Sequence, residues 1–253
     1  MDILRLIILG AMSGYLAAFA AAVTRARRLS RVLFATGFAL ASLAFVYRWC
    51  QTGHAPMQNL FEVFLALGVL AWPGSLFWRR WLSVQESAVD PLLGFLILFP
   101  VGFLFSSEPR PLPPALQSGL FVPHVAAYLA AYVILLRAAC VAGTSLVRGD
   151  ESEQVTYRLV AFGFPPLTLG LVLGSLWARL AWGDYWGWDP KELWSLATWL
   201  TFAAYLHLGK FEGKGFGRLR AAVVVTGGVF ILLTLLWVNL AGKLFPGLHS
   251  YSF

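Results

Sequence analysis

Apolar residues in this sequence fall into about eight blocks, which short polar segments separate. The blocks lie at roughly 4–23, 32–50, 59–78, 88–106, 122–143, 159–181, 190–208 and 221–241. A helix of about 20 apolar residues crosses a bilayer core, whereas the strands of a membrane barrel alternate in polarity over roughly 10 residues. The pattern therefore predicts an all-α, polytopic integral membrane protein. We expect about eight transmembrane helices that form a single membrane domain over residues 1–253.

The charge content supports this class. Hydrophobic residues make up 59% of the chain and charged residues 12%, against about 25% charged residues in an average soluble protein. A surface that faces water on all sides needs more charge than this. The net charge of +7 is divided among short loops between the apolar blocks, which is typical of membrane topology and excludes nucleic acid as the expected partner.

The basic residues also predict an orientation. They gather in four connecting segments, at 24–31, 79–81, 144–158 and 209–220. All four segments fall on one side of the membrane if the spans alternate, and the positive-inside rule makes that side cytoplasmic. Both termini are then outside, together with the loops at 50–58, 107–121 and 182–189.

Two short segments predict helix starts at the outer surface. Asp189 offers an N-terminal cap, Pro190 suits the first helical position, and Glu192 can reach back to the cap. Asn59 and Glu62 form a weaker version of the same arrangement. We therefore expect helices to begin just after residues 59 and 189.

Two pairs of glycines have the spacing of close helix contacts. They are Gly10 with Gly14, and Gly170 with Gly174. Small residues four positions apart let two helix backbones approach each other. The sequence leaves open whether each pair packs within this chain or against a partner.

Tryptophan is concentrated in one part of the chain. Six of the eleven tryptophans lie between residues 177 and 199: Trp177, Trp182, Trp186, Trp188, Trp194 and Trp199. An aromatic belt at the membrane interface would spread these residues over many helix ends. Their concentration favours a second interpretation, a flat aromatic platform for a ligand in the external loop 182–189.

The residues from Trp182 to Glu192 resemble the tryptophan-rich "WWD" signature of haem-handling membrane proteins in c-type cytochrome assembly, and within that group the CcsA/ResC family of System II. Four further segments match this family in order: 56–62, Pro114-Ala115-Leu116-Gln117-Ser118 with the following His124, Tyr205-Leu206-His207, and Gly247-Leu248-His249-Ser250-Tyr251. The resemblance therefore extends from about residue 54 to 251.

The resemblance assigns roles to three of the four histidines. Haem iron takes axial ligands from His, Met, Cys or Tyr. The resemblance implies that His124 and His249 are the axial pair of an external haem. It implies that His207 belongs to an inner, entry-side haem site, whose second ligand comes from a partner protein. His207 lies about 27 Å along the seventh helix, towards the cytoplasmic side. His54 matches no axial role, and we expect it in a solvated loop.

Haem b is thus the expected cofactor, both as substrate and as ligand, with no catalytic group separable from haem binding. The expected haem-binding residues are Trp182, Trp186, Trp188 and Asp189, together with the iron ligands His124, His249 and His207. The two propionates of haem need cations or amide donors. The outer-side candidates are Arg110, Arg179, Lys191 and Lys243, among which the sequence does not choose.

The resemblance implies the haem-handling subunit of a System II cytochrome c synthase, a haem lyase complex that attaches haem to apocytochrome c through thioethers. The chain holds no C-x-x-C-H segment, so it is not itself the acceptor, and no C-x-x-C pair to reduce the acceptor's thiols. The implied partners are a ResB/Ccs1-type membrane protein, apocytochrome c, and, indirectly, thioredoxin-like reductants. The expected location is the bacterial cytoplasmic membrane, with the thylakoid membrane as the alternative.

Two other functions are open to a chain with this signature. One is a haem-delivery binding protein of the CcmC kind, and the other is a regulatory membrane protein of the HemX kind. Eight expected spans and the His249-Ser250-Tyr251 tail favour the synthase subunit.

Overall fold

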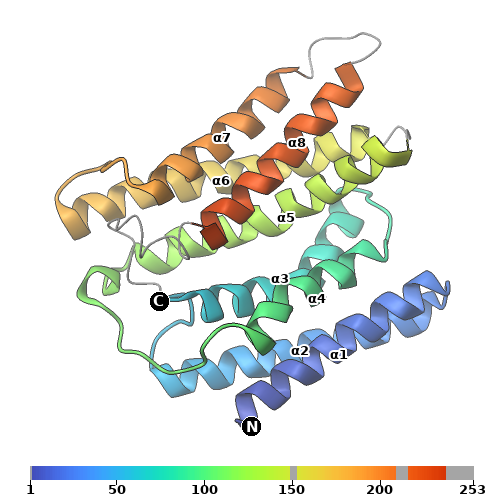
Figure 1. The fold of residues 1–253 in the computed structure, drawn as a ribbon, viewed down its shortest axis with the longest axis horizontal. Helices are drawn as coiled ribbons and strands as arrows, with labels where there is room; N and C mark the ends of the chain where they lie inside the picture. Colours follow the sequence, from blue (N-terminus) through green and yellow to red (C-terminus); the bar gives the residue numbers. More distant parts are fainter. Residues whose placement is uncertain (1, 149–152, 209–215, 238–253) are drawn as a thin grey trace. The chain divides into compact units, whose positions relative to one another are not determined.

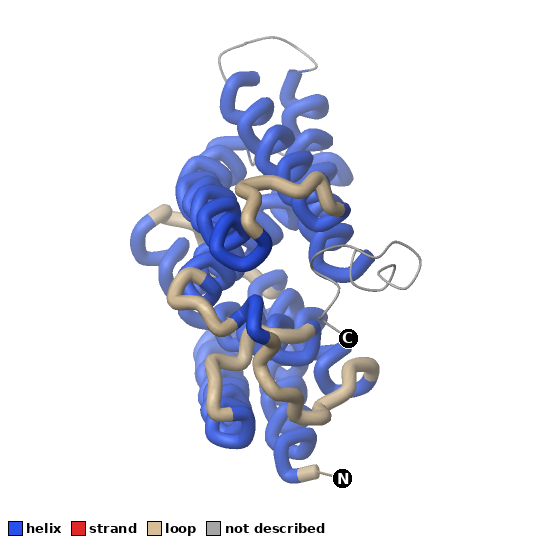
Figure 2. Tube along the Cα trace, turned by 90° about the vertical axis from the view of Figure 1, so that its left-hand side faces the viewer, coloured by secondary structure: helices blue, strands red, loops and turns tan. Residues whose placement is uncertain are grey.

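The computed structural model describes residues 2–148, 153–208 and 216–237. Within these ranges all regular secondary structure is helical (Figures 1 and 2). The α-helices are α1 (Ile3–Val23), α2 (Arg27–Thr52), α3 (Leu60–Trp81), α4 (Val89–Phe103), α5 (Phe121–Arg148), α6 (Glu153–Trp182), α7 (Pro190–Leu208) and α8 (Phe216–Leu232). A short 3₁₀ turn, η1 (Pro114–Leu116), precedes α5, and a π-helical turn, η2 (Leu233–Trp237), continues α8. The prediction of an all-α fold is confirmed.

Six of the described helical segments are long and apolar enough to cross a membrane: α1, α2, α3, α5, α6 and the segment Gly217–Trp237. The other two α-helices, α4 and α7, are not among these candidate spans, for different reasons. α4 is apolar but has only 15 residues, about 22 Å of helix against a bilayer core of ~30 Å. α7 has 19 residues but carries Lys191 and Glu192 in its first turn. The chain is a polytopic helical membrane protein, and a total of eight spans stays a prediction.

The eight described α-helices lie where the eight apolar blocks lie; the ends of α7 agree with its block, and the ends of several others differ. α4 ends at Phe103, short of the predicted end at 106, because Leu104 and Phe105 already bond back to the Pro100 carbonyl. The predicted loop 24–31 shrinks to the turn 24–26, since α2 begins at Arg27. At its other end α2 stops at Gly53, whose φ of 71° is the left-handed conformation that commonly terminates helices.

The chain forms two compact units, Met1–Pro113 and Pro114–Phe253. In the first unit α1 packs along α2 and against α4, and α3 packs on α4 and α2. The Gly10–Gly14 pair permits the α1–α2 contact: a Cβ on Gly14 would lie 3.0 Å from the Cα of Gly37 in α2. This glycine pair therefore packs within the chain. That the chain forms a single membrane domain stays a prediction.

Polar contacts show which segments of the first unit lie together at each of its two ends. At one end Arg5 donates to the carbonyl of Phe105 at 2.9 Å, so the start of α1 lies beside the segment after α4. At the other end Arg31 and Arg79 both face Glu86, at 3.7 and 3.6 Å. The start of α2, the end of α3 and the loop that carries Glu86 thus meet at one end of the unit, as alternation of the spans predicts. Which end faces the cytoplasm stays a prediction.

The second unit holds α5–α8, with α5 packed between α6 and α8 and α7 beside α8 (Figure 1). At one end the η1 carbonyl of Ala115 accepts a hydrogen bond from Trp177, near the end of α6. At the other end Arg220 of α8 forms an ion pair with Glu153 of α6. Ala115 and Trp177 therefore lie at one end of this unit, and Glu153 and Arg220 lie at the other.

Both predicted helix caps are present. The backbone N–H of Glu192 donates to Oδ1 of Asp189 at 2.8 Å, and Oε2 of Glu192 accepts from the N–H of Asp189 at 3.3 Å. In the second case the N–H of Glu62 donates to Oδ1 of Asn59 at 3.0 Å. The return bond to Glu62 comes from Gln58, one residue before the cap, at 2.9 Å. Because a cap bond is local, the sequence predicted the bonds to Asp189 and Asn59, whereas the bond from Gln58 was not predicted.

Candidate functional site

The imidazole of His124 lies in the first turn of α5 and bonds to the backbone of α6. Its Nδ1 is 2.9 Å from the carbonyl oxygen of Gly170. A carbonyl oxygen only accepts, so Nδ1 must carry the proton, and the lone pair of the neutral ring is then on Nε2. Histidines that bind metals are commonly fixed in this way, with one ring nitrogen donating to a backbone carbonyl and the other binding the metal.

The glycine pair of α6 makes room for this ring. A Cβ placed on Gly174 would lie 2.5 Å from Cε1 of His124 and 2.9 Å from its Nδ1. A Cβ on Gly170 would lie 2.9 Å from Cδ2 of Tyr128, one turn further along α5. The Gly170–Gly174 pair therefore packs within the chain, and its contact is with the side chains of His124 and Tyr128.

Trp177 completes the surroundings of His124. It is 2% exposed, and its indole stacks on the imidazole with centroids 5.7 Å apart and planes inclined by 22°. Tyr128 meets the same imidazole edge to face at 5.2 Å. The indole Nε1 of Trp177 donates to the Ala115 carbonyl at 2.9 Å, which fixes the plane of the stack. We call Gly170, Gly174 and Trp177 the α6 cradle of His124.

Trp182 extends this aromatic group to the end of α6. Its ring centroid is 4.8 Å from that of Trp177, at an interplanar angle of 66°. The structure therefore brings one predicted haem-binding tryptophan, Trp182, together with one predicted iron ligand, His124, through Trp177. Sequence reasoning omitted Trp177 from the site. The sequence did indicate Trp177, because it lies three residues after Gly174 and seven after Gly170. This spacing puts all three residues on one face of the helix.

The other predicted tryptophans form a separate pair. Trp186 and Trp188 meet at 5.9 Å in an edge-to-face arrangement, and Trp188 is 66% exposed with a φ of 57°. The loop that carries them is held by Glu192, whose Oε2 also accepts from the N–H of Gly187 at 2.8 Å. Buried Asp189 caps α7 as described above. The loop thus presents one large apolar ring from a backbone that its own helix cap restrains.

The remaining predicted iron ligands are placed differently. His249 lies outside the described residues, as does Lys243. His207 is in the last turn of α7, where it is exposed and its Nδ1 is 2.8 Å from the carbonyl of Ala203. The same reasoning leaves the lone pair of this imidazole on Nε2. Of the predicted propionate partners, Arg110 is exposed, and Arg179 lies over the Tyr185 ring at 5.7 Å.

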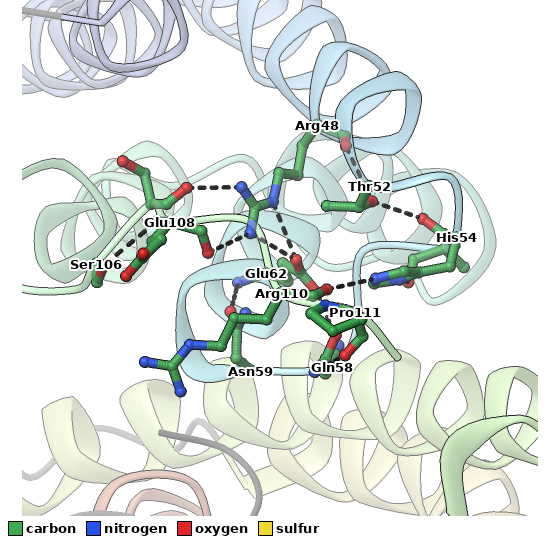
Figure 3. Close-up of polar contacts among 12 residues, drawn as sticks. Arg48, Thr52, His54, Gln58, Asn59, Glu62, Ser106, Glu108, Arg110 and Pro111 are labelled. Carbon is green, nitrogen blue, oxygen red and sulfur yellow. Dashed lines mark hydrogen bonds and ion pairs between the residues drawn. The ribbon is translucent and has the colours of Figure 1, made fainter. Parts of the chain in front are cut away.

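A fully buried ion pair in the first unit was missed by sequence reasoning (Figure 3). Arg48 of α2 and Glu62 of α3 are both 0% exposed, with Nη2 and Oε1 2.9 Å apart. Arg48 also donates to the carbonyls of Ser107 and Glu108, at 2.7 and 3.2 Å. The sequence signal was a lone arginine inside an apolar block, which is costly in a membrane and therefore has a partner.

Two further side chains, those of Gln58 and His54, also contact the backbone of the segment after α4. Gln58 donates to the carbonyl of Pro111 at 3.1 Å, and Nε2 of His54 lies 3.4 Å from the carbonyl of Arg110. His54 is half-buried in this group, in contact with backbone on both ring nitrogens. Arg48 of α2 and the loop between α2 and α3 thus hold the backbone of 107–111, and the side chains of Glu108 and Arg110 are exposed (Figure 3).

Together these features define a class of protein. The chain is a polytopic helical membrane protein in which the imidazole of His124 stacks on the indole of Trp177, and Trp182 meets that indole edge to face. Imidazole is an axial ligand of haem iron, and flat aromatic side chains pack well on a flat ligand. The donor set around His124 therefore fits haem.

Comparisons with known proteins identify the family. A family model described as cytochrome C assembly protein matches residues 6–245. The cytochrome c biogenesis protein CcsA of Chlamydomonas reinhardtii is 33% identical over 249 residues, which cover 89% of this chain and 69% of that protein. CcsA of Parasynechococcus marenigrum strain WH8102 is 33% identical over 282 residues, which cover 93% and 90%. The chain belongs to the CcsA/ResC family of cytochrome c assembly proteins.

One solved structure has a similar fold. The cytochrome c haem lyase CcmF superposes with a TM-score of 0.73 at 20% sequence identity. The match covers 92% of this chain and 46% of CcmF, so the chain spans a little less than half of that protein. At this identity the likeness shows the fold alone.

Proposed function

We propose that this chain is the haem-handling subunit of a System II cytochrome c synthase. In this role it carries haem across or to the outer face of the membrane and presents it to apocytochrome c for thioether attachment. The observation that carries the proposal is His124, whose Nδ1 is fixed by the Gly170 carbonyl and whose imidazole stacks on the indole of Trp177. Membership in a family of cytochrome c biogenesis proteins supports the same role.

In this proposal haem is the substrate, and the protein holds and orients it. His124 and His249 are the axial ligands of the outer site, and the indoles of Trp182, Trp186 and Trp188 support the macrocycle. Asp189 contributes by capping α7 and so fixing the start of the loop's helix. Each acceptor thiol adds its sulfur and hydrogen across one vinyl double bond, so the chain's contribution is position and not an additional reacting group.

His207 has a separate role in the proposal. It is exposed near the predicted cytoplasmic end of α7, with its Nδ1 turned back to Ala203. An imidazole that is exposed on the side of a membrane helix can bind the same haem as a second protein. We therefore assign it to an inner, entry-side haem whose second ligand belongs to a ResB/Ccs1-type partner.

The experiment that tests this function is a maturation assay. The chain is produced with its ResB/Ccs1-type partner and a reporter cytochrome that carries C-x-x-C-H, in cells without their own maturation system. Covalent haem on the reporter is measured after denaturing electrophoresis. We expect wild type and His54→Ala to support attachment and His124→Ala to reduce it at least tenfold. Attachment that is independent of this chain, or equal in all three variants, would reject the proposal.

The partner also distinguishes the alternatives. A haem-delivery protein of the CcmC kind would bind haem without the ResB/Ccs1-type partner and would pass it to a soluble chaperone. A regulatory protein of the HemX kind would leave reporter attachment unchanged when it is removed.

A further inference from the structure

Three residues of α6 surround the imidazole of His124. The ring contacts Gly170, Gly174 and Trp177 of α6, and these three residues lie on one face of that helix. Such an arrangement restricts three properties of the imidazole: its tautomer, its distance from α6, and its plane. Each property is set by a different member of the α6 cradle.

The tautomer is set by the Gly170 carbonyl, which accepts from Nδ1 at 2.9 Å. The distance from α6 is set by Gly174, since a Cβ there would lie 2.5 Å from Cε1 of the ring. The plane is set by Trp177, which stacks on the ring at an inclination of 22°. Trp177 is itself held through its bond to Ala115, so the imidazole is restrained by groups that have their own fixed partners.

We infer that Gly174 and Trp177 are positioning residues that preset His124 in its Nδ1–H tautomer, with Nε2 as the coordinating atom, before haem arrives. The inference rests on the proposed function for the identity of the ligand, and it adds the coordinating atom and the residues that orient it. A ligand held within a few tenths of an ångström of its productive position loses less entropy when iron binds.

Gly174 is the residue on which the arrangement depends most directly. A side chain at this position pushes the ring away from α6, because the atoms that an added Cβ would meet all belong to the imidazole of His124. The Nδ1–H bond to Gly170 is then lost, and a neutral imidazole in a freer setting populates the other tautomer as well. Gly174→Ala therefore changes the histidine without removing it.

A matched control exists on the same helix. A Cβ on Gly163 would lie 2.9 Å from Cδ2 of Leu135, which is comparably close. Its neighbour is the flexible end of an apolar side chain and not His124. Gly163→Ala and Gly174→Ala thus make the same chemical change in α6, and only the second acts on the imidazole.

The experiment has one readout without haem and one with it. Protein labelled with ¹⁵N-histidine is purified haem-free in detergent, and the His124 signals are assigned by their loss in His124→Gln. Wild type and Gly163→Ala should show a protonated Nδ1 and an unprotonated Nε2, whereas Gly174→Ala should show a tautomer mixture. In the complex with the partner, Gly174→Ala should lower the low-spin haem fraction at least fivefold relative to Gly163→Ala.

Unchanged histidine spectra in Gly174→Ala would overturn the inference, as would an equal effect of Gly163→Ala. If Gly174→Ala does not accumulate, Trp177→Phe and Trp177→Leu give the same test, because only Phe keeps a flat ring against the imidazole. The wild-type tautomer should persist in Phe and be lost in Leu, and its persistence in both would overturn the inference. If the tautomer is as expected but His124→Ala leaves haem binding unchanged, the proposed function fails while the positioning stands.

Discussion

The imidazole of His124 lies against the indole of Trp177 with ring centroids 5.7 Å apart, and Trp177 in turn bonds to Ala115. These residues come from α5, α6 and the η1 turn, so three separate segments of the second unit meet at one ring. A predicted ligand and a residue that the prediction omitted are thus parts of one arrangement.

Trp177→Phe should keep the stack on His124 and lose the bond to the Ala115 carbonyl. Loss of this part-buried hydrogen bond costs about 1 kcal/mol, which lowers the melting temperature by roughly 2–4 °C for a chain of this size. Thermal unfolding in detergent measures this change. We expect the haem content of the complex to stay within about twofold of wild type. A complete loss of haem in Trp177→Phe at unchanged stability would contradict the positioning role given to the flat ring.

Arg48→Met should destabilise the first unit strongly, because it leaves the carboxylate of Glu62 buried without its cation. Breaking a buried pair by removal of one partner costs about 3–5 kcal/mol, and replacement of both partners by apolar residues is often close to neutral. The double variant Arg48→Met/Glu62→Leu should therefore be more stable than the single variant. Thermal unfolding in detergent measures both.

The control for this comparison is Arg79→Met. Arg79 faces Glu86 at 3.6 Å, and the two side chains are 38% and 32% exposed. Exposed pairs contribute about 0–1 kcal/mol, so the melting temperature should barely change. If Arg79→Met and Arg48→Met were equally destabilising, the importance given to the buried pair would be wrong. In the double variant, faster proteolysis within 107–111 would show that Arg48 holds that segment.

Glu192→Ala should loosen the tryptophan loop, since Oε2 of Glu192 accepts from the N–H groups of Gly187 and Asp189. Glu192→Gln retains an oxygen at this position and should preserve most of the restraint. Loss of a helix cap of this kind costs about 0.5–2 kcal/mol. Limited proteolysis between residues 183 and 188 should accelerate in the Ala variant and not in the Gln variant. Equal cleavage in both would mean that the cap does not order the loop.

His207→Ala should leave the isolated chain as stable as wild type, because the side chain is exposed and bonds only to its own helix among the described residues. In the complex with the partner it should lower the haem-to-protein ratio while the spectrum of the outer haem persists. Pyridine haemochrome quantification of the purified complex measures this ratio. An unchanged ratio would remove His207 from the proposed inner site.

Sequence patterns predicted the features that depend on neighbouring residues. The helical class follows from the apolar blocks, and the caps at Asn59 and Asp189 follow from side chains that bond within three residues. The start of α7 at Pro190 was predicted to the residue for the same reason. The geometry of a helix cap depends only on residues within one turn, so caps can be predicted from the sequence.

Features formed by residues far apart in the sequence were not predictable in this way. The bond from His124 reaches the Gly170 carbonyl 46 residues away, and that from Arg48 reaches the Ser107 carbonyl 59 residues away. No local spacing indicates such pairs. The glycine spacing in α6 predicted a close contact, but only the structure identifies the contacting residue as His124. The role of His249 stays a prediction because it lies outside the described residues.

The central claim is that His124 is an axial ligand of the outer haem. The most direct measurement is the absorption spectrum of the detergent-purified chain, made with its partner, for wild type, His124→Ala, His249→Ala and the control His54→Ala. The account predicts low-spin, six-coordinate haem in wild type and His54→Ala, and its loss or conversion to high spin in the other two, with partial recovery on addition of imidazole. An unchanged spin state and haem content in His124→Ala would contradict the account.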